Sequence, residues 1–144
     1  MIYLDTSALF KLVHREAETD ALSTWLLERV ELPKITSALT RVELLQATRR
    51  LESSPVGIAT ALLAGIDVIP ISAVVTDVAS ELDHVRSLDA IHLASALSIN
   101  DGSLVMLTYD VRLREASLRI GVSVETPVTT IPEIPHSRSP KFPT

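Results

Sequence analysis

The chain has 144 residues, which is the size of a single domain and leaves no room for a second folded one. Apolar residues make up 47% of it but only five residues are aromatic, so we expect an aliphatic core and no platform of rings for stacking nucleic-acid bases. With 13 basic and 18 acidic residues the net charge is -5, which argues against a basic surface that holds phosphates by itself.

The first third of the chain alternates short apolar runs with segments of helical spacing. Residues 2–4 form an apolar run that stops at Asp5, a pattern typical of a buried strand followed by a helix. Residues 17–30 place apolar side chains at helical spacing and predict an amphipathic helix. Residues 34–37 predict a second strand, and another helix is expected over 40–51.

The rest of the chain continues this alternation. A helix over 55–64 is expected to stop at Gly65, and residues 87–100 are apolar or small around nearly the whole circumference, which predicts a largely buried helix. The remaining predicted elements are strands at 66–71, 104–108 and 122–124 and helices at 74–84 and 110–120. This alternation predicts an α/β fold with a mostly parallel sheet covered on both faces.

The composition changes after Glu125, because five of the eight prolines lie in the last 18 residues. We therefore predict a domain over 1–125 and a proline-rich tail over 126–144 that is dispensable for chemistry. The absence of cysteine excludes disulfides and a thiolate site. No uncharged apolar run reaches the roughly 18 residues of a membrane span, and an acid at position 5 is unlike a signal peptide, so we expect a cytoplasmic protein.

Four acids are predicted to meet at one edge of the sheet. Asp5 directly follows the first strand, and Asp110 follows the fourth. Asp89 begins the buried helix that leads into the fourth strand, and Glu43 lies early in the helix after the second. Ligands of parallel sheets gather beyond the carboxyl ends of the strands, where all four carboxylates can reach.

Like charges in one cleft repel unless cations neutralise them, and Mg²⁺ prefers oxygen ligands of this kind. Each acid also has a purely structural interpretation. Glu43 with Thr40 is a capping box, Asp89 and Asp110 complement helix dipoles, and Asp5 is a helix N-cap. The joint placement of all four favours a metal site for phosphate-ester hydrolysis.

Other polar residues carry weaker signals. His92 is expected to be a hydrogen-bonded core histidine, and Ser7 lacks the partners of a hydrolase triad. Arg112, Arg114 and Arg119 are expected to form a solvated helix face, with phosphate contact the lesser alternative.

At this point the chain resembles the PIN-domain nucleases, and more narrowly the VapC-type toxins of bacterial and archaeal toxin–antitoxin pairs. The resemblance spans residues 1 to about 125 and rests on the segments Leu4-Asp5-Thr6-Ser7-Ala8-Leu9, Glu43, Leu88-Asp89-Ala90-Ile91-His92-Leu93-Ala94 and Leu107-Thr108-Tyr109-Asp110. It assigns the family's acidic quartet to Asp5, Glu43, Asp89 and Asp110, with Asp5 and Asp89 as direct magnesium ligands, and its supporting hydroxyls to Ser7 and Thr108.

The resemblance also implies a PIN-like three-layer fold with a five-stranded parallel sheet in the order 3-2-1-4-5. It implies dependence on Mg²⁺ or Mn²⁺, endonucleolytic cleavage of structured RNA, a homodimer, and inhibition by a cognate antitoxin protein across the cleft. Apolar helix faces beyond what one sheet covers independently favour a dimer.

The hypothesis is therefore a Mg²⁺-dependent endoribonuclease, the toxin of such a pair, that uses metal-activated water to cleave the phosphodiester. A PIN nuclease of RNA maturation outside a toxin system remains an alternative, as does a catalytically silent protein-binding module. An aspartyl phosphatase is disfavoured because its signature needs an acid where Ser7 stands.

Overall fold

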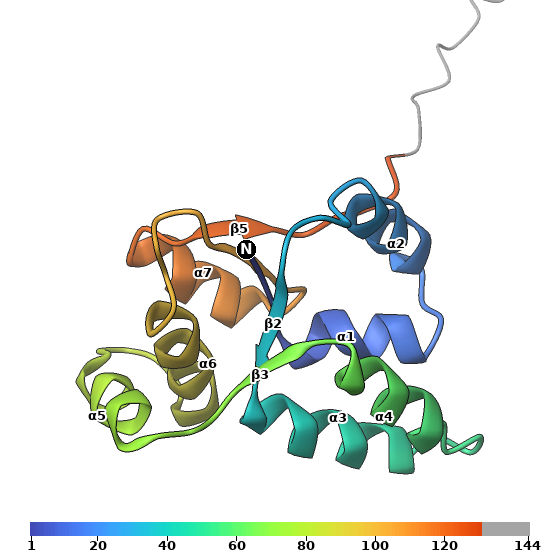
Figure 1. The fold of residues 1–144 in the computed structure, drawn as a ribbon, viewed down its shortest axis with the longest axis horizontal. Coiled ribbons are helices and arrows are strands. Elements are labelled where there is room, and N and C mark those ends of the chain that lie inside the picture. The colour runs from blue at the N-terminus through green and yellow to red at the C-terminus, as the bar shows by residue number, and fades with distance from the viewer. Residues whose placement is uncertain (131–144) are drawn as a thin grey trace, which may run out of the picture.

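Five short strands form one parallel sheet through the middle of the molecule. The computed structural model describes residues 1–130. Within them the strands are β1 (Ile2–Leu4), β2 (Lys34–Ser37), β3 (Asp67–Ile69), β4 (Val105–Leu107) and β5 (Ser123–Glu125). They pair in parallel in the order β3-β2-β1-β4-β5 (Figure 1). The predicted fold class and strand order are confirmed.

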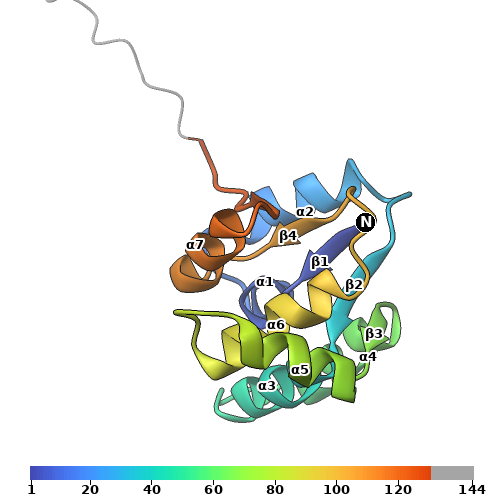
Figure 2. The same cartoon turned by 90° about the vertical axis from the view of Figure 1, so that its left-hand side faces the viewer.

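Helices cover both faces of this sheet. They are α1 (Thr6–Val13), α2 (Thr19–Leu27), α3 (Ala38–Arg49), α4 (Val56–Ala64), α5 (Ala73–Glu81), α6 (Ser87–Leu97) and α7 (Val111–Arg119). Figure 1 shows α5, α6 and α7 on one side of the strands and α1, α3 and α4 on the other, and Figure 2 looks at the side that α5, α6 and α7 cover. The chain therefore folds into three layers.

The alternation of side chains along β1 divides the core between the two faces. Ile2 and Leu4 pack with Leu9 and Leu44 on the side of α1 and α3, whereas Tyr3 packs with Leu93 and other residues on the side of α6 and α7. All six are fully or almost fully buried. Burial of each large aliphatic side chain stabilises the fold by about 1.5–3 kcal/mol. The core is aliphatic as predicted, and Tyr3 is its buried aromatic exception.

One predicted helix start is wrong. Helix α3 begins at Ala38, and the hydroxyl of Ser37 caps it by accepting the backbone N–H of Leu39 at 3.1 Å. The expected capping box of Thr40 with Glu43 does not form, because Thr40 lies inside the helix and is fully buried beside the Thr36 hydroxyl. Glu43 consequently stands in the second turn of α3, where it is free of capping and available to other groups.

Among residues 1–130, no helix combines the length and the apolar character needed to cross a bilayer.

The segment after β5 holds the loop between β4 and α7. The Thr126 hydroxyl donates to the carbonyl of Thr108 at 2.8 Å, and the Tyr109 hydroxyl donates to the carbonyl of Pro127 at 2.7 Å. The Lys11 ammonium lies 4.6 Å from the centroid of the Tyr109 ring. The first residues of the predicted tail thus contact the domain, while residues 131–144 of that tail lie outside the described residues.

The boundary at Glu125 can be tested by truncation. A chain ending at Thr130 should melt like the full chain, because it keeps both hydrogen bonds to the loop over 108–109. A chain ending at Glu125 should melt a few degrees lower, since each lost bond contributes about 1 kcal/mol. Thr126→Val in the full chain isolates one of the two bonds. Identical melting temperatures for the two truncated chains and for Thr126→Val would show that residues 126–127 contribute nothing to stability.

Candidate active site

Four carboxylates gather at the carboxyl edge of the two central strands. Asp5 follows β1 and Asp110 follows the neighbouring β4, while Glu43 comes from α3 and Asp89 from the first turn of α6. The four side chains line one cavity of about 290 Å³, together with Thr6, Ser7, Phe10, His92 and Leu113. The structure therefore brings the sequence-predicted acids into a single site.

Asp5 is the buried acid of the cluster, with an exposed fraction of 3%. Its Oδ1 accepts the backbone N–H of Ala8 at 3.0 Å, which makes Asp5 the N-cap of α1. The Ser7 hydroxyl donates to Oδ1 at 2.7 Å, and the Thr108 hydroxyl donates to Oδ2 at 2.6 Å. Burial raises the pKa of Asp5, and the bonds from Thr108, Ala8 and Ser7 oppose that shift. Asp5 is therefore both the N-cap of α1 and a member of the acidic cluster.

Backbone amides fix the direction in which the two supporting hydroxyls donate. The N–H of Tyr109 donates to Ser7 Oγ at 2.8 Å, and the N–H of Asp110 donates to Thr108 Oγ1 at 3.0 Å. Each hydroxyl accepts from the backbone and still has its own proton for the Asp5 carboxylate. The loop between β4 and α7 is in this way tied to Asp5 through Ser7 and Thr108.

Glu43 is held through one of its two oxygens. The Thr6 hydroxyl donates to Oε1 at 2.7 Å, and Nε2 of His92 lies 2.7 Å from the same atom. Partial burial alone would raise the pKa of Glu43, but the hydrogen bonds from His92 and Thr6 lower it. Glu43 is thus ionised at neutral pH, and Oε2 has no hydrogen-bond partner within residues 1–130.

His92 connects this acid to the core. An ionised carboxylate only accepts hydrogen bonds, so Nε2 of His92 is protonated and donates the hydrogen bond to Glu43. On the other side of the ring, Nδ1 lies 2.8 Å from the hydroxyl of Tyr3. Burial raises the pKa of Tyr3 far above neutrality, so its hydroxyl keeps a proton that it can donate to Nδ1. The predicted core histidine is confirmed, and it also orients Glu43.

Asp110 and Asp89 complete the cluster in different ways. Asp110 is the N-cap of α7, since its Oδ1 accepts the backbone N–H groups of Arg112 at 2.9 Å and Leu113 at 3.0 Å. Asp89 has no hydrogen-bond partner within residues 1–130. Partial burial raises the pKa of Asp89, and the negative charge of Asp110 raises it further. The two carboxylates are near enough to repel each other.

The chemistry of this donor set fits a hard divalent cation. All four acids offer oxygens, and among residues 1–130 neither a lysine nor an arginine lines the cavity. Within residues 1–130 no three acidic or histidine side chains converge closely enough to form a ready coordination shell. Mg²⁺ keeps several waters and takes one or two carboxylates, so a site for this ion does not require such a shell.

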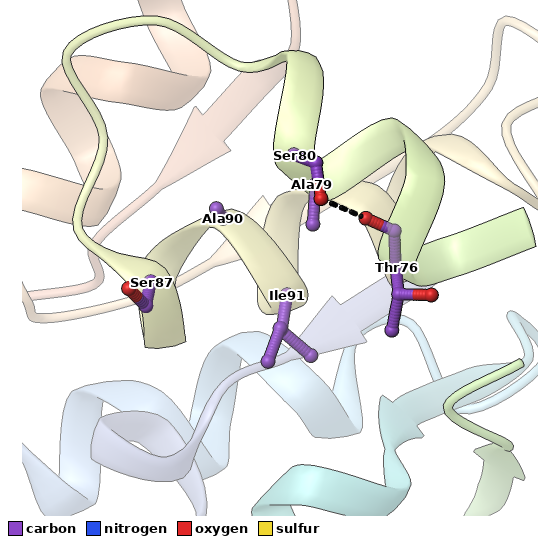
Figure 3. Close-up of a pocket in the computed structure, with 6 residues that line it drawn as sticks. All are labelled: Thr76, Ala79, Ser80, Ser87, Ala90 and Ile91. Carbon is purple, nitrogen blue, oxygen red and sulfur yellow. Dashed lines mark hydrogen bonds between the residues drawn. The ribbon is translucent and has the colours of Figure 1, made fainter. Parts of the chain in front are cut away.

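A second hollow, between α5 and α6, lacks groups of this kind. It measures about 210 Å³ and is lined by Thr76, Ala79, Ser80, Ser87, Ala90 and Ile91 (Figure 3). The Ser80 hydroxyl already donates to the carbonyl of Thr76 at 2.7 Å. None of its six side chains titrates near neutral pH, so the acidic cavity is the better candidate for catalysis.

Sequence reasoning missed two residues of the site. The sequence pattern assigns no role to Thr6, although its position beside Asp5 places it at the same edge. His92 was considered a core residue, although it stands three positions after Asp89 and therefore on the same face of one helix. The i, i+3 spacing was the signal that could have found it.

Comparisons with known proteins identify a family, relatives of similar sequence and solved structures of similar fold. The model of the family described as PIN domain matches residues 2–118. Ribonuclease VapC35 of Mycobacterium tuberculosis is 44% identical over 131 residues, covering 88% of this chain and 97% of the relative. Ribonuclease VapC46 of the same species is 38% identical over 128 residues with the same coverage. A toxin–antitoxin complex from Klebsiella pneumoniae contains a chain of the same fold, with a TM-score of 0.68, 20% identity and coverage of 90% of this chain and 100% of that one.

The partial burial of Asp89 and its repulsion by Asp110 should lower the stability of the protein at neutral pH. A carboxyl whose pKa is raised by folding stabilises the protein below its unfolded pKa and loses that contribution as the pH rises through the folded pKa. In EDTA at neutral pH, Asp89→Asn should therefore melt at or above the temperature of the parent, and the difference should vanish in acid.

Asp77→Asn, on the exposed side of α5, is the matched control. If Asp89 instead stabilised the dipole of α6, Asp89→Asn would lower the free energy of unfolding by about 0.3–1 kcal/mol. A lower melting temperature of Asp89→Asn in EDTA at neutral pH would contradict the repulsion.

Proposed function

The chain belongs to the PIN domain family, and we propose that it is a Mg²⁺-dependent endoribonuclease that acts as the toxin of a VapBC-type toxin–antitoxin pair. The observation that carries this proposal is the cavity that Asp5, Glu43, Asp89 and Asp110 line together. Relatives that this chain matches over 88% of its length are named ribonucleases, which supports RNA as the substrate. The resemblance favours a structured RNA.

Asp5 and Asp89 are the residues proposed to hold the ion. Asp5 is fixed by hydrogen bonds to both of its oxygens, whereas Asp89 is free of such bonds within residues 1–130. A bound Mg²⁺, or Mn²⁺ in its place, would lower the pKa of a water and stabilise the charge that develops on the phosphate. One acid thus gives the ion a fixed position, and the other adjusts to it.

Glu43 and Asp110 each have one carboxylate oxygen that accepts hydrogen bonds from the protein. Oε1 of Glu43 takes the bonds from Thr6 and His92, so Oε2 is the atom proposed to accept a proton from the attacking water. Oδ1 of Asp110 takes the two N–H groups of α7, which leaves Oδ2 to orient that water or a second ion. Both carboxylates are thereby prevented from turning away from the substrate.

The cleavage assay tests the proposal directly. Purified protein should cut deproteinised bacterial RNA with Mg²⁺ or Mn²⁺ and should stop cutting in EDTA. Asp5→Asn should lower the cleavage rate by about 100-fold or more, and Ser7→Ala by about 10- to 100-fold because Ser7 orients Asp5. Asp77→Asn should cleave like the parent.

Three outcomes would oppose this function. Undiminished cleavage in EDTA would exclude the metal-dependent mechanism. Absence of cleavage with either metal, from a folded protein, would favour the catalytically silent binding module. Cleavage confined to precursor RNA, without an inhibitory partner, would favour the nuclease of RNA maturation.

A homodimer and a cognate antitoxin are the proposed protein partners. Large apolar side chains stand exposed on several helices, among them Val42, Ile58 and Val74 with exposed fractions of 59%, 58% and 65%. Association would bury such surface. The uncompensated carboxylates of the acidic cavity suit an antitoxin arginine, whose guanidinium can engage a carboxylate through two hydrogen bonds.

Light scattering tests both partners. The protein alone should have the mass of a dimer at micromolar concentration, and addition of the protein encoded beside its gene should increase that mass and inhibit cleavage. Replacement of the arginine that reaches the cavity by alanine should relieve inhibition. A monomer would refute the homodimer, and full inhibition by every arginine variant would refute the arginine contact.

A further inference from the structure

A small basic hollow adjoins the acidic cavity and shares Asp89 with it. It measures about 200 Å³ and lies between α7 and the loop that leads into α6. Helices α6 and α7 lie side by side (Figures 1 and 2). We name it the arginine hollow after the three guanidinium side chains that line it. Its lining residues are His84, Val85, Arg86, Asp89, Arg112, Glu115, Ala116 and Arg119.

Within residues 1–130 the three arginines form no salt bridge, which they share with Lys34, Arg41, Arg49, Arg50 and Arg114, and they differ from those cations in lining one hollow together. Lys11 binds Glu16 and Glu18 at 2.6 and 2.9 Å, and Arg15 binds Asp20 at 2.6 Å. Within residues 1–130, Arg86, Arg112 and Arg119 form no salt bridge with any carboxylate. In a chain of net charge -5, three unpaired guanidinium groups around one hollow indicate an anionic ligand.

One internal contact keeps the arginine hollow in shape. The Arg119 guanidinium donates to the backbone carbonyl of His84 at 3.3 Å, which ties the end of α7 to the loop before α6. This bond uses one donor of Arg119 and leaves its charge uncompensated. Arg112 stands at the start of α7, next to Asp110 of the acidic cavity. The arginine hollow thus begins at the edge of the proposed cleavage site.

We propose that the arginine hollow binds a backbone phosphate of the RNA strand, next to the phosphodiester that is cut in the acidic cavity. The inference rests on the proposed ribonuclease function and adds the direction in which the strand leaves the site. Guanidinium groups match the geometry and charge of a phosphate, and each can offer two parallel hydrogen bonds. Glu115 and Asp89 also line the hollow, so three guanidinium groups face two carboxylates there and a net positive charge remains.

The arrangement also explains how an acidic chain can hold a polyanion. Four carboxylates with a bound cation receive the scissile phosphate, and three arginines receive a neighbouring phosphate. The positive charge is concentrated where the strand passes. A contact with a flanking phosphate strengthens the substrate complex and the transition state equally, so it acts on KM and not on kcat.

Binding of RNA as a function of salt concentration tests the proposal. The probe is a short fluorescein-labelled RNA hairpin, and every protein carries Asp5→Asn so that the probe stays intact. Arg112→Ala should weaken binding and reduce the slope of log affinity against log salt by about 0.7–0.9, the contribution of one phosphate contact. Arg119→Ala should act in the same direction, and the double variant should lose more than either. Arg114→Ala is the control, because Arg114 is exposed on the same helix but does not line the arginine hollow.

Kinetics supply the second measurement, in proteins that keep Asp5. Arg112→Ala should raise KM for RNA with kcat unchanged, whereas Arg114→Ala should leave both constants unchanged. Arg112, Arg114 and Arg119 are exposed, and melting curves should confirm that their alanine variants fold.

Equal affinity and equal salt slope for Arg112→Ala, Arg119→Ala and Arg114→Ala would overturn the proposal. A site for free phosphate would be recognised by a stabilisation of the protein by inorganic phosphate that Arg112→Ala abolishes while RNA binding is retained, and it would equally overturn the RNA contact. Failure of the parent to cleave RNA would instead refute the proposed function, and the binding measurement does not depend on cleavage.

Discussion

The burial of Asp5 at an edge of the sheet that it shares with three other carboxylates is the constraint on which the site depends. Asp5 is buried, and burial raises its pKa, so the fold must supply hydrogen bonds to keep its carboxylate in place. Ser7, Ala8 and Thr108 supply them from two neighbouring strand ends. The strand order makes this possible, because β1 and β4 lie side by side although a hundred residues separate them in the chain. A fold that separated these strands would leave Asp5 without Thr108.

The hydrophobic core and the site are physically continuous. Side chains of a strand alternate between its two faces, so Tyr3 points away from Ile2 and Leu4 and meets His92. His92 then orients Glu43 from α3, which packs on the opposite side of the sheet. A packing change around Tyr3 would therefore reach a carboxylate that lines the acidic cavity.

Sequence patterns predicted those parts of the molecule that depend on neighbouring residues. The short apolar runs gave the strands β1 and β2 with correct bounds, and the strand ends located Asp5 and Asp110. The start of α3 was misplaced because Ser37 and Thr40 are both good caps, and only the burial of Thr40 decides between them. The arginine hollow was not predicted as a hollow, since it depends on how α7 packs against the loop before α6. Long-range packing of this kind leaves no periodic signal in the sequence.

Electron paramagnetic resonance of Mn²⁺ tests the central claim, that these carboxylates form one cation site. Free Mn²⁺ gives a sharp signal that is lost on binding, so titration of the protein yields the affinity and number of bound ions without any substrate. The parent should bind Mn²⁺ in competition with Mg²⁺, and Asp5→Asn or Asp89→Asn should each weaken binding by about 10-fold or more, whereas Asp77→Asn should not. Equal Mn²⁺ binding by the parent and by Asp5→Asn and Asp89→Asn, or no binding by the parent, would contradict the claim.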